Sequence, residues 1–310
     1  EKDIVEQRPE YDESCYLCPT NKRADGDSNP DYKGTYVFDN DFAALRMDGP
    51  DVDYTDGDLF VAKREKGICR VICFSERHDL TVAEMSVEAI RGVIDVWQEQ
   101  FKDLSSRKEI SYVQIFENKG AVMGCSNPHP HGQVWAQTSV PLDPAKESIK
   151  FKEYYNRLGK TLLEDYLVQE LEKSERILIE NEHFVALIPF WACWPFESMI
   201  IPKRAVQNVL ELSDDEKDAF AAVYKELTVM YDNLFETSFP YSAGLHQAPT
   251  DGEDYPEWHL HMHFYPPLLR SSKVKKFMVG YEMLAESQRD ITPEWSAQKL
   301  RDLGKTHYKL

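Results

Sequence analysis

The chain has 310 residues, of which 42% are hydrophobic and 12% aromatic, and it carries a formal net charge of −18. This apolar content is enough for the core of one large or two smaller globular domains, and it excludes a disordered or low-complexity chain. The negative charge argues against nucleic acids and anionic membranes as partners, because binding either one requires a basic surface.

The first half is predicted to combine short strands with one long helix. Residues 1–34 are polar and rich in Asp, Pro and Gly, which favours loop structure. The capping box Thr81-x-x-Glu84 precedes apolar residues at helical spacing between Ile90 and Phe101, which predicts an amphipathic helix. Short strands are expected at Thr35–Phe38, Phe42–Leu45, Cys69–Phe74 and Tyr112–Phe116.

The second half repeats this order. Asn181–Ile188 resembles the segment that begins at Asn40, Met199–Ile201 is a predicted strand, and Ser213-x-x-Glu216 is a second capping box before a helix. Each half ends in a His-x-His pair, and 132 residues separate the two pairs as well as the two capping boxes. We therefore expect a duplicated α+β unit, with halves at residues 1–140 and 176–310 and a connector of one or two helices at 141–175.

The cysteines and the apolar pattern bear on location. Six cysteines at irregular spacing do not form a disulfide framework, so we expect a reducing, cytoplasmic setting. The sequence has no apolar run of 18 residues and no secretory signal pattern at its start, so we expect no membrane association. Cys15-x-x-Cys18 has metal-ligand spacing, which is a weak signal alone.

The densest group of reactive side chains lies between Asn127 and Trp135, in the sequence Asn-Pro-His-Pro-His-Gly-Gln-Val-Trp. Residues two apart on an extended chain share a face, so both histidines and the glutamine should point the same way. The two prolines stiffen the segment and favour a sheet edge. The preceding loop, residues 118–126, offers backbone N–H groups and small side chains that suit a phosphate group. Together these features predict a rigidly held, nucleophilic imidazole.

This stretch, following Phe116-Glu-Asn-Lys-Gly120, resembles the active-site signature of the galactose-1-phosphate uridylyltransferase family, within the histidine-triad superfamily. The resemblance implies an α+β fold of duplicated histidine-triad-like half-barrel units, with antiparallel sheets and flanking helices. It extends over nearly the whole chain, through Cys15–Cys18, Asn29–Tyr32, Gly34–Phe38, Asn40–Leu45, His246–Pro249, His261–Arg270 and Lys276–Leu284.

The resemblance also implies a ping-pong reaction of galactose metabolism (the Leloir pathway). His131 would attack the α-phosphorus of UDP-glucose, release glucose-1-phosphate and pass the uridylyl group to galactose-1-phosphate, giving UDP-galactose. Gln133 stands where related hydrolases have a third histidine and would protect the covalent intermediate from water. The implied substrate contacts in this half are Asn40, Asp41 and Phe42 for uridine, and Asn118, Gly124, Cys125 and Ser126 in the phosphate-binding loop.

Two metal sites are implied in the same way. One is a zinc site, and the other holds iron or zinc. His259 stands where the family usually has Gln; of two alternatives, a competing metal ligand and a surface histidine, we expect the second. The implied ligands are Cys15, Cys18, His78 and His129 for the zinc, and Glu147, His246, His261 and His263 for the second metal.

A further segment matches the hexose-phosphate-binding region that the family takes from its partner subunit, which implies a homodimer with shared active sites. Upstream of Cys15 the basic residues are Lys2 and Arg8, with no match to the family's phosphate-binding motif; a preceding segment would hold it. The implied hexose-phosphate contacts are Lys276, Phe277, Val279, Tyr281, Glu282 and Gln288.

Two alternatives stay open at this point. A dinucleoside-tetraphosphate phosphorylase also carries Gln after its active histidine, and a non-catalytic, metal-stapled nucleotide-binding module would not need His131. The Asn-Asp-Phe pocket and residues 276–288 favour the uridylyltransferase. Since the net charge is negative, we expect a neutral or positive cleft to bind the anionic substrates through local donors.

Overall fold

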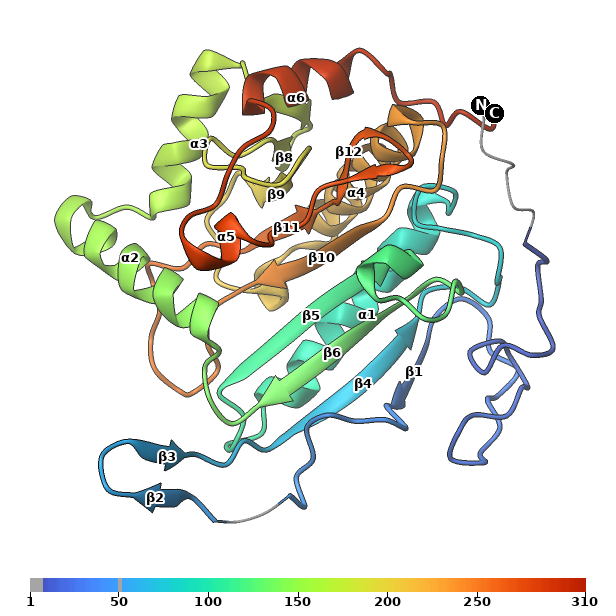
Figure 1. Cartoon of the computed structure of the whole chain (residues 1–310), viewed down its shortest axis with the longest axis vertical. Coiled ribbons are helices and arrows are strands. Elements are labelled where there is room, and N and C mark those ends of the chain that lie inside the picture. Colours follow the sequence, from blue (N-terminus) through green and yellow to red (C-terminus); the bar gives the residue numbers. More distant parts are fainter. Residues whose placement is uncertain (1–7, 50–51) are drawn as a thin grey trace.

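The computed structural model describes residues 8–49 and 52–310, so Lys2 lies outside the described residues. Its centre is a nine-stranded antiparallel sheet with the strand order β1-β4-β6-β5-β10-β11-β9-β8-β7 (Figure 1). The strands are β1 Tyr36–Asp39, β4 Gly67–Cys73, β5 Tyr112–Lys119, β6 His131–Gln137, β7 Ile177–Glu180, β8 Phe184–Leu187, β9 Ser198–Pro202, β10 Tyr241–His246 and β11 His261–Tyr265. Two separate hairpins pair β2 Tyr54–Asp56 with β3 Phe60–Ala62, and β12 Leu268–Ser271 with β13 Val274–Lys275.

The strand order is mirrored about the central β5–β10 pair. Moving outward on one side, β5 is followed by β6, β4 and β1; on the other side, β10 is followed by β11, β9 and β8. The central pair itself is antiparallel, with Phe116 opposite Gly244. The expected α+β class with antiparallel sheets is confirmed, and the strands of the two sequence halves belong to one continuous sheet.

Two long helices, α1 Val87–Ser105 and α4 Asp214–Leu234, cover one face of this sheet and lie behind the central strands in Figure 1. Their apolar faces meet through Trp97, whose ring packs against Phe220 and Tyr224. Burying these faces against the sheet supplies most of the stability that helices of this length have in water. The other helical elements are α2 Leu142–Leu158, α3 Leu162–Lys173, α5 Tyr281–Leu284, α6 Pro293–Arg301 and the 3-10 turns η1 Ala121–Met123 and η2 Val209–Glu211.

The second predicted capping box is confirmed and the first is wrong. Ser213 accepts a hydrogen bond from the backbone N–H of Glu216, whose carboxylate accepts from the Ser213 N–H. Thr81 and Glu84 instead close an isolated turn, with Thr81 Oγ1 donating to the Glu84 carboxylate. Helix α1 starts later, where Ser86 caps it. The same sequence pattern therefore caps a helix only where the following backbone continues it.

Two further expectations about strands are wrong. Residues 42–45 form turns, because Asn40 Oδ1 accepts the N–H of Phe42 and the Asn40 carbonyl accepts that of Ala43, which bends the chain. The segment with two prolines does not lie at a sheet edge. It precedes β6, which is an interior strand between β4 and β5, so the missing N–H groups fall outside the hydrogen-bonded ladder.

Residues 141–175, where one or two helices are expected, contain the two helices α2 and α3. Among the described residues, no helix combines the length and the apolar composition that crossing a membrane requires.

A buried ion pair joins the two halves beside the central strands. Asp232 on α4 accepts from Lys119 Nζ on β5 at 2.9 Å and from the Phe239 N–H at 2.8 Å, and its other oxygen lies 3.2 Å from His307 Nε2. Burial alone would raise the pKa of Asp232, but Lys119 and His307 outweigh burial and hold this pKa below its usual value. The contribution of Asp232 to stability is therefore present at neutral pH and lost as the pH falls through the lowered pKa.

We expect Asp232→Asn to lower the free energy of unfolding by about 3 kcal/mol, because it leaves the Lys119 ammonium buried without a countercharge. Urea unfolding followed by circular dichroism would measure the change. Asp31→Asn is the matched control, since Asp31 pairs with Lys33 on the surface and such pairs contribute little. A loss below about 1 kcal/mol in Asp232→Asn would contradict this expectation.

Candidate active site and metal clusters

The His131 ring lines a pocket, and one of its nitrogens is held by a backbone contact. Its Nδ1 donates to the His129 carbonyl at 2.7 Å, which leaves the lone pair on Nε2. Burial lowers the pKa of His131, so the ring is neutral at pH 7. The next residue, Gly132, has no room for a side chain, because a Cβ there would lie 2.8 Å from the Phe74 ring and 2.9 Å from the Phe116 carbonyl oxygen. The imidazole is therefore rigidly placed and able to act as a nucleophile.

Gln133 lines the same pocket, and Trp135 fixes the orientation of its amide. The indole Nε1, which can only donate, lies 2.9 Å from Gln133 Oε1, and Asn40 Nδ2 approaches the same oxygen at 3.5 Å. With its oxygen occupied, Gln133 presents its NH₂ group as a donor. Sequence reasoning did not identify Trp135, although it stands two residues after Gln133 on the same strand face.

The predicted phosphate-binding residues Asn118, Gly124, Cys125 and Ser126 line this pocket together with His131. Ser242 on β10 donates to Asn118 Oδ1 at 2.7 Å, so the NH₂ group of Asn118 is left to donate. Gly124 has φ of 80°, a left-handed conformation that suits glycine and turns the loop back toward the pocket. Ser242 was missed because it lies 124 residues from Asn118, and only the β5–β10 register brings them together.

Asn40, Asp41 and Phe42 complete the pocket from the turn after β1. The Asp41 carboxylate is 3.5 Å from Arg23 Nε and accepts the N–H of Ala24. Arg23 is thus a countercharge for Asp41, and it also pairs with Asp25 at 2.8 Å. The Phe42 side chain is 77% exposed, which leaves its ring available to cover a bound base.

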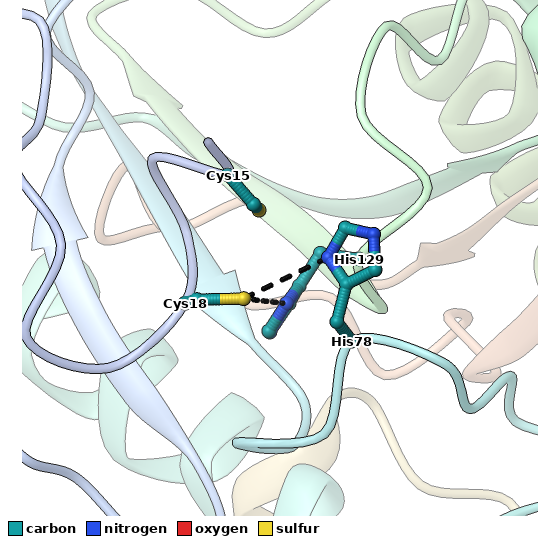
Figure 2. A group of neighbouring side chains, drawn as sticks. All are labelled: Cys15, Cys18, His78 and His129. Carbon is teal, nitrogen blue, oxygen red and sulfur yellow. Dashed lines mark hydrogen bonds between the residues drawn. The ribbon is translucent and has the colours of Figure 1, made fainter. Parts of the chain in front are cut away.

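Cys15, Cys18, His78 and His129 converge as predicted (Figure 2), and their potential ligand atoms lie within 4.8 Å of one another. Cys18 Sγ is 3.6 Å from His129 Nδ1 and 3.7 Å from His78 Nδ1. Ligand atoms of a tetrahedral zinc ion lie about 3.5 Å apart, so the set fits zinc. Burial raises the pKa of Cys18 to about 12, and a bound cation would therefore be needed to hold it as a thiolate.

Neighbouring groups orient this cluster. His129 Nε2 lies 2.8 Å from the Ser75 carbonyl, to which it donates, so Nδ1 faces the cysteines. Asn127 joins the cluster to the strand, because its Nδ2 is 3.3 Å from Cys15 Sγ and its Oδ1 accepts the His129 N–H. Since His129 and His131 are two residues apart, an ion at this cluster would fix the start of β6, where His131 lies.

The second predicted cluster also assembles, from α2, β10 and β11. His246 Nδ1 contacts Glu147 at 2.9 Å, while His261 Nε2 and His263 Nε2 each lie 3.8 Å from this carboxylate. Burial would raise the pKa of Glu147, but the histidines hold it well below its usual value, and burial lowers the pKa of His263 to about 3. Both ring nitrogens of His263 are buried without a hydrogen-bond partner among the described residues. An unpartnered imidazole beside a carboxylate suits a metal ligand, and these four residues together could hold a metal ion.

His259 is not a surface histidine, so this expectation is wrong. Its side chain is 0% exposed, with Nε2 2.8 Å from the Pro202 carbonyl and Nδ1 3.2 Å from Thr161 Oγ1. Histidine can occupy this interior position because both nitrogens have partners.

The predicted hexose-phosphate residues between Lys276 and Gln288 do not join the pocket of their own chain. The described residues that surround His131 include none of them. Lys276 pairs with Glu282 and Asp290 instead. Val279, Tyr281, Met283 and Leu284 are largely exposed.

Arg8 was noted only as one of two upstream basic residues. The structure places its guanidinium 2.6 Å from the Pro128 carbonyl, just before the strand that begins at His131.

Known proteins of one family match this chain over its whole length. Family models described as the N-terminal and C-terminal domains of galactose-1-phosphate uridyl transferase match residues 1–141 and 147–310. The galactose-1-phosphate uridylyltransferase of Haemophilus influenzae is 52% identical, and the alignment covers 100% of this chain and 88% of that protein. The Rattus norvegicus enzyme of the same name is 49% identical, over 100% of this chain and 82% of that protein.

Solved structures agree on the fold. One described as a uridylyltransferase matches with a TM-score of 0.83 at 25% identity, over 96% of this chain and 94% of its own. An ADP-glucose phosphorylase from Arabidopsis thaliana, solved with bound ADP-glucose, matches with a TM-score of 0.77 at 22% identity. The match covers 96% of this chain and 93% of that one, and it shows a shared fold alone. Together with the matched domains and the full-length relatives, the geometry around His131 identifies the chain as a member of the galactose-1-phosphate uridylyltransferase family.

Proposed function

We propose that this protein transfers a uridylyl group from UDP-glucose to galactose-1-phosphate. The observation that carries the proposal is the His131 ring, whose Nδ1–H is bonded to a carbonyl and which lines a pocket together with Asn118, Ser126 and Gln133. A steady-state assay tests it: UDP-galactose should form only when both substrates are present, with the parallel double-reciprocal lines of a ping-pong reaction. Intersecting lines would contradict a covalent intermediate.

The reaction divides into two displacements at the α-phosphorus. In the first, the Nε2 lone pair forms an N–P bond while the bond from phosphorus to the bridging oxygen breaks, and glucose-1-phosphate leaves with that electron pair. In the second, a phosphate oxygen of galactose-1-phosphate attacks and the N–P bond breaks. Throughout, the His129 carbonyl accepts Nδ1–H and stabilises the positive charge on the substituted ring, while Asn118 and Gln133 can donate to the phosphoryl oxygens.

The relatives favour this reaction over the two alternatives. The two full-length relatives described above both carry the uridylyltransferase name. The turn of Asn40, Asp41 and Phe42 beside His131 offers polar and aromatic contacts for a uridine. A non-catalytic binding module would have no use for a neutral imidazole with a free nitrogen lone pair in the pocket.

We expect Gln133→His to convert part of the transfer into hydrolysis of UDP-glucose. An amide is a poor proton acceptor, whereas an imidazole at the same place would act as a general base for water, an effect typically of about 10²-fold or more. Release of UMP from UDP-glucose alone would measure it. Gln137→His is the matched control, because Gln137 lies four residues further along the same face of β6 and does not line the pocket. Equal UMP release by both variants would contradict the assigned role of Gln133.

We propose zinc at the cysteine–histidine cluster, and iron or zinc at the cluster of Glu147, His246, His261 and His263. Both sites would be structural. The first would supply a rigid anchor for the strand that carries His131, and the second would attach α2 to β10 and β11. Neither ion would contact the phosphorus.

We further propose a cytoplasmic homodimer, with halves at residues 1–140 and 176–310 joined by the connector 141–175. All six cysteines are free thiols, which supports a reducing location. The exposed apolar side chains of the hexose-phosphate segment support a subunit contact there, with Met283 75% and Leu284 89% exposed. Lys276 and its neighbours would then reach the active site of the partner.

If active sites are shared, two inactive variants should complement each other. His131→Ala and Lys276→Ala would each be inactive as homodimers, but a heterodimer would contain one intact site. After co-expression we expect about one quarter of the wild-type activity, because random pairing makes half of the dimers mixed. Mixing wild-type protein with His131→Ala controls for assembly. No activity in the co-expressed pair, with heterodimers detected by mass, would contradict shared sites.

A further inference from the structure

The two halves hold a buried histidine in the same way, just before β6 and just before β11. His129 Nε2 lies 2.8 Å from the carbonyl of Ser75, which follows β4; His259 Nε2 lies 2.8 Å from the carbonyl of Pro202, the last residue of β9. Strands β4 and β9 occupy matching places in the mirrored sheet, next to β6 and β11. The two histidines are therefore structural counterparts.

Their backbone carbonyls have matching roles too. The carbonyl of His129 accepts Nδ1–H of His131 at 2.7 Å, and the carbonyl of His259 accepts Nδ1–H of His261 at 2.8 Å. The same contact thus orients a nucleophile in one half and a potential metal ligand in the other. His129 and His131 therefore correspond to His259 and His261, which lie 130 residues later in the chain. The correspondence with His261 and His263, expected from the spacing of 132 residues, is wrong.

The second ring nitrogen distinguishes the two counterparts. His129 Nδ1 faces Cys18, whereas His259 Nδ1 lies 3.2 Å from the hydroxyl of Thr161, the N-cap residue of α3. The Pro202 carbonyl can only accept, so His259 carries its proton on Nε2 and accepts the Thr161 hydroxyl at Nδ1. Thr161 Oγ1 in turn accepts the N–H of Glu164, so the chain of hydrogen bonds is complete.

The residue before His259 attaches the other connector helix. Trp258 Nε1 donates to Ser148 Oγ at 2.9 Å, and Ser148 follows Glu147 on α2. Consecutive residues of one segment therefore hold both helices of the connector against β11. Glu147 reaches the histidine cluster from a helix that this segment fixes.

We propose that His259 is a positioning residue for the second metal cluster. It fixes the backbone from which His261 is oriented, and through Thr161 it holds the connector that supplies Glu147. The inference rests on the proposal that this cluster binds a metal ion.

The test compares His259→Phe, which keeps a ring but loses both hydrogen bonds, with His259→Gln, whose amide can donate to Pro202 and accept from Thr161. We expect His259→Phe to weaken metal binding at the second cluster by about 10- to 100-fold, and His259→Gln to stay near the wild type. Metal content by mass spectrometry after titration with a chelator gives the affinity. The cysteine–histidine cluster of the same molecule is the internal control and should keep its ion in every variant.

A second pair of variants tests the Thr161 hydroxyl, which Thr161→Ser keeps and Thr161→Val removes. Thr161→Ser should bind the second metal as the wild type does, and Thr161→Val should lose affinity in the same direction as His259→Phe. In metal-stripped protein, ¹⁵N shifts of His261 should report the Nδ1–H form in the wild type and a mixture of forms in His259→Phe.

Wild-type affinity and an unchanged His261 tautomer in His259→Phe would overturn the positioning role. Wild-type protein that retains metal only at the cysteine–histidine cluster would instead overturn the metal site itself, and the inference with it.

Discussion

His131→Ala should reduce the formation of UDP-galactose by a factor of about 10⁴ or more, because it removes the imidazole proposed to form the covalent intermediate. Among the residues that line the pocket, His131 is the one whose neutral ring presents a free nitrogen lone pair; Asn118 and Gln133 present amide donors. The measurement is initial velocity with both substrates saturating.

Two controls separate loss of chemistry from loss of fold. His131 is outside the set of four proposed zinc ligands, so His131→Ala should keep any bound zinc and its unfolding midpoint. His183→Ala replaces a half-buried histidine that lines neither pocket beside His131, and it should keep full activity. Transfer by His131→Ala within a factor of about 10 of the wild type would contradict the assignment of the nucleophile.

Cys18→Ser should lose the zinc of the first cluster and much of the stability of the N-terminal half. The Cys18 side chain is fully buried and contacts both histidine ligands, and a serine hydroxyl is a poor replacement for a thiolate. Structural zinc sites contribute about 10 kcal/mol or more to folding in small domains, so we expect a loss of at least about 3 kcal/mol here. Metal content and urea unfolding measure the two effects.

Activity should fall with the zinc, because His129 joins the cluster to the segment that holds His131. Cys193→Ser is the matched control, since Cys193 is a half-buried thiol outside both clusters, with Trp191 as its hydrogen-bond partner. It should keep its metal, stability and activity. Full zinc occupancy in Cys18→Ser would contradict the proposed ligand set.

Local patterns predicted the two long helices and several strands of the central sheet. Apolar residues at helical spacing located α1 and α4, and the alternating residues around His131 located β6. The predicted capping box at Thr81 and the predicted strand at residues 42–45 fail for the same reason. A local pattern does not show how far the chain continues in one direction. Thr81-x-x-Glu84 has the same form as Ser213-x-x-Glu216, yet the chain turns after Thr81 and the helix starts only at Ser86.

The residues of the candidate site were predicted largely through the family resemblance. The contacts that support these residues could not be predicted from the sequence. Ser242 supports Asn118, and Thr161 supports His259, through strand and helix contacts between residues far apart in the sequence. The burial of His259 was missed for the same reason, because its partners come from β9 and from the start of α3. Matching the halves by sequence spacing also paired the wrong histidines, since only the hydrogen bonds show which residues are equivalent.

The most direct test of the central claim is the mass of the protein after incubation with UDP-glucose alone. The account predicts one uridylyl group per chain, attached to His131, labile in acid and absent from His131→Ala. Adding galactose-1-phosphate should remove it and yield UDP-galactose. A protein that binds UDP-glucose but gains no uridylyl group, or that gains one equally in His131→Ala, would contradict the account.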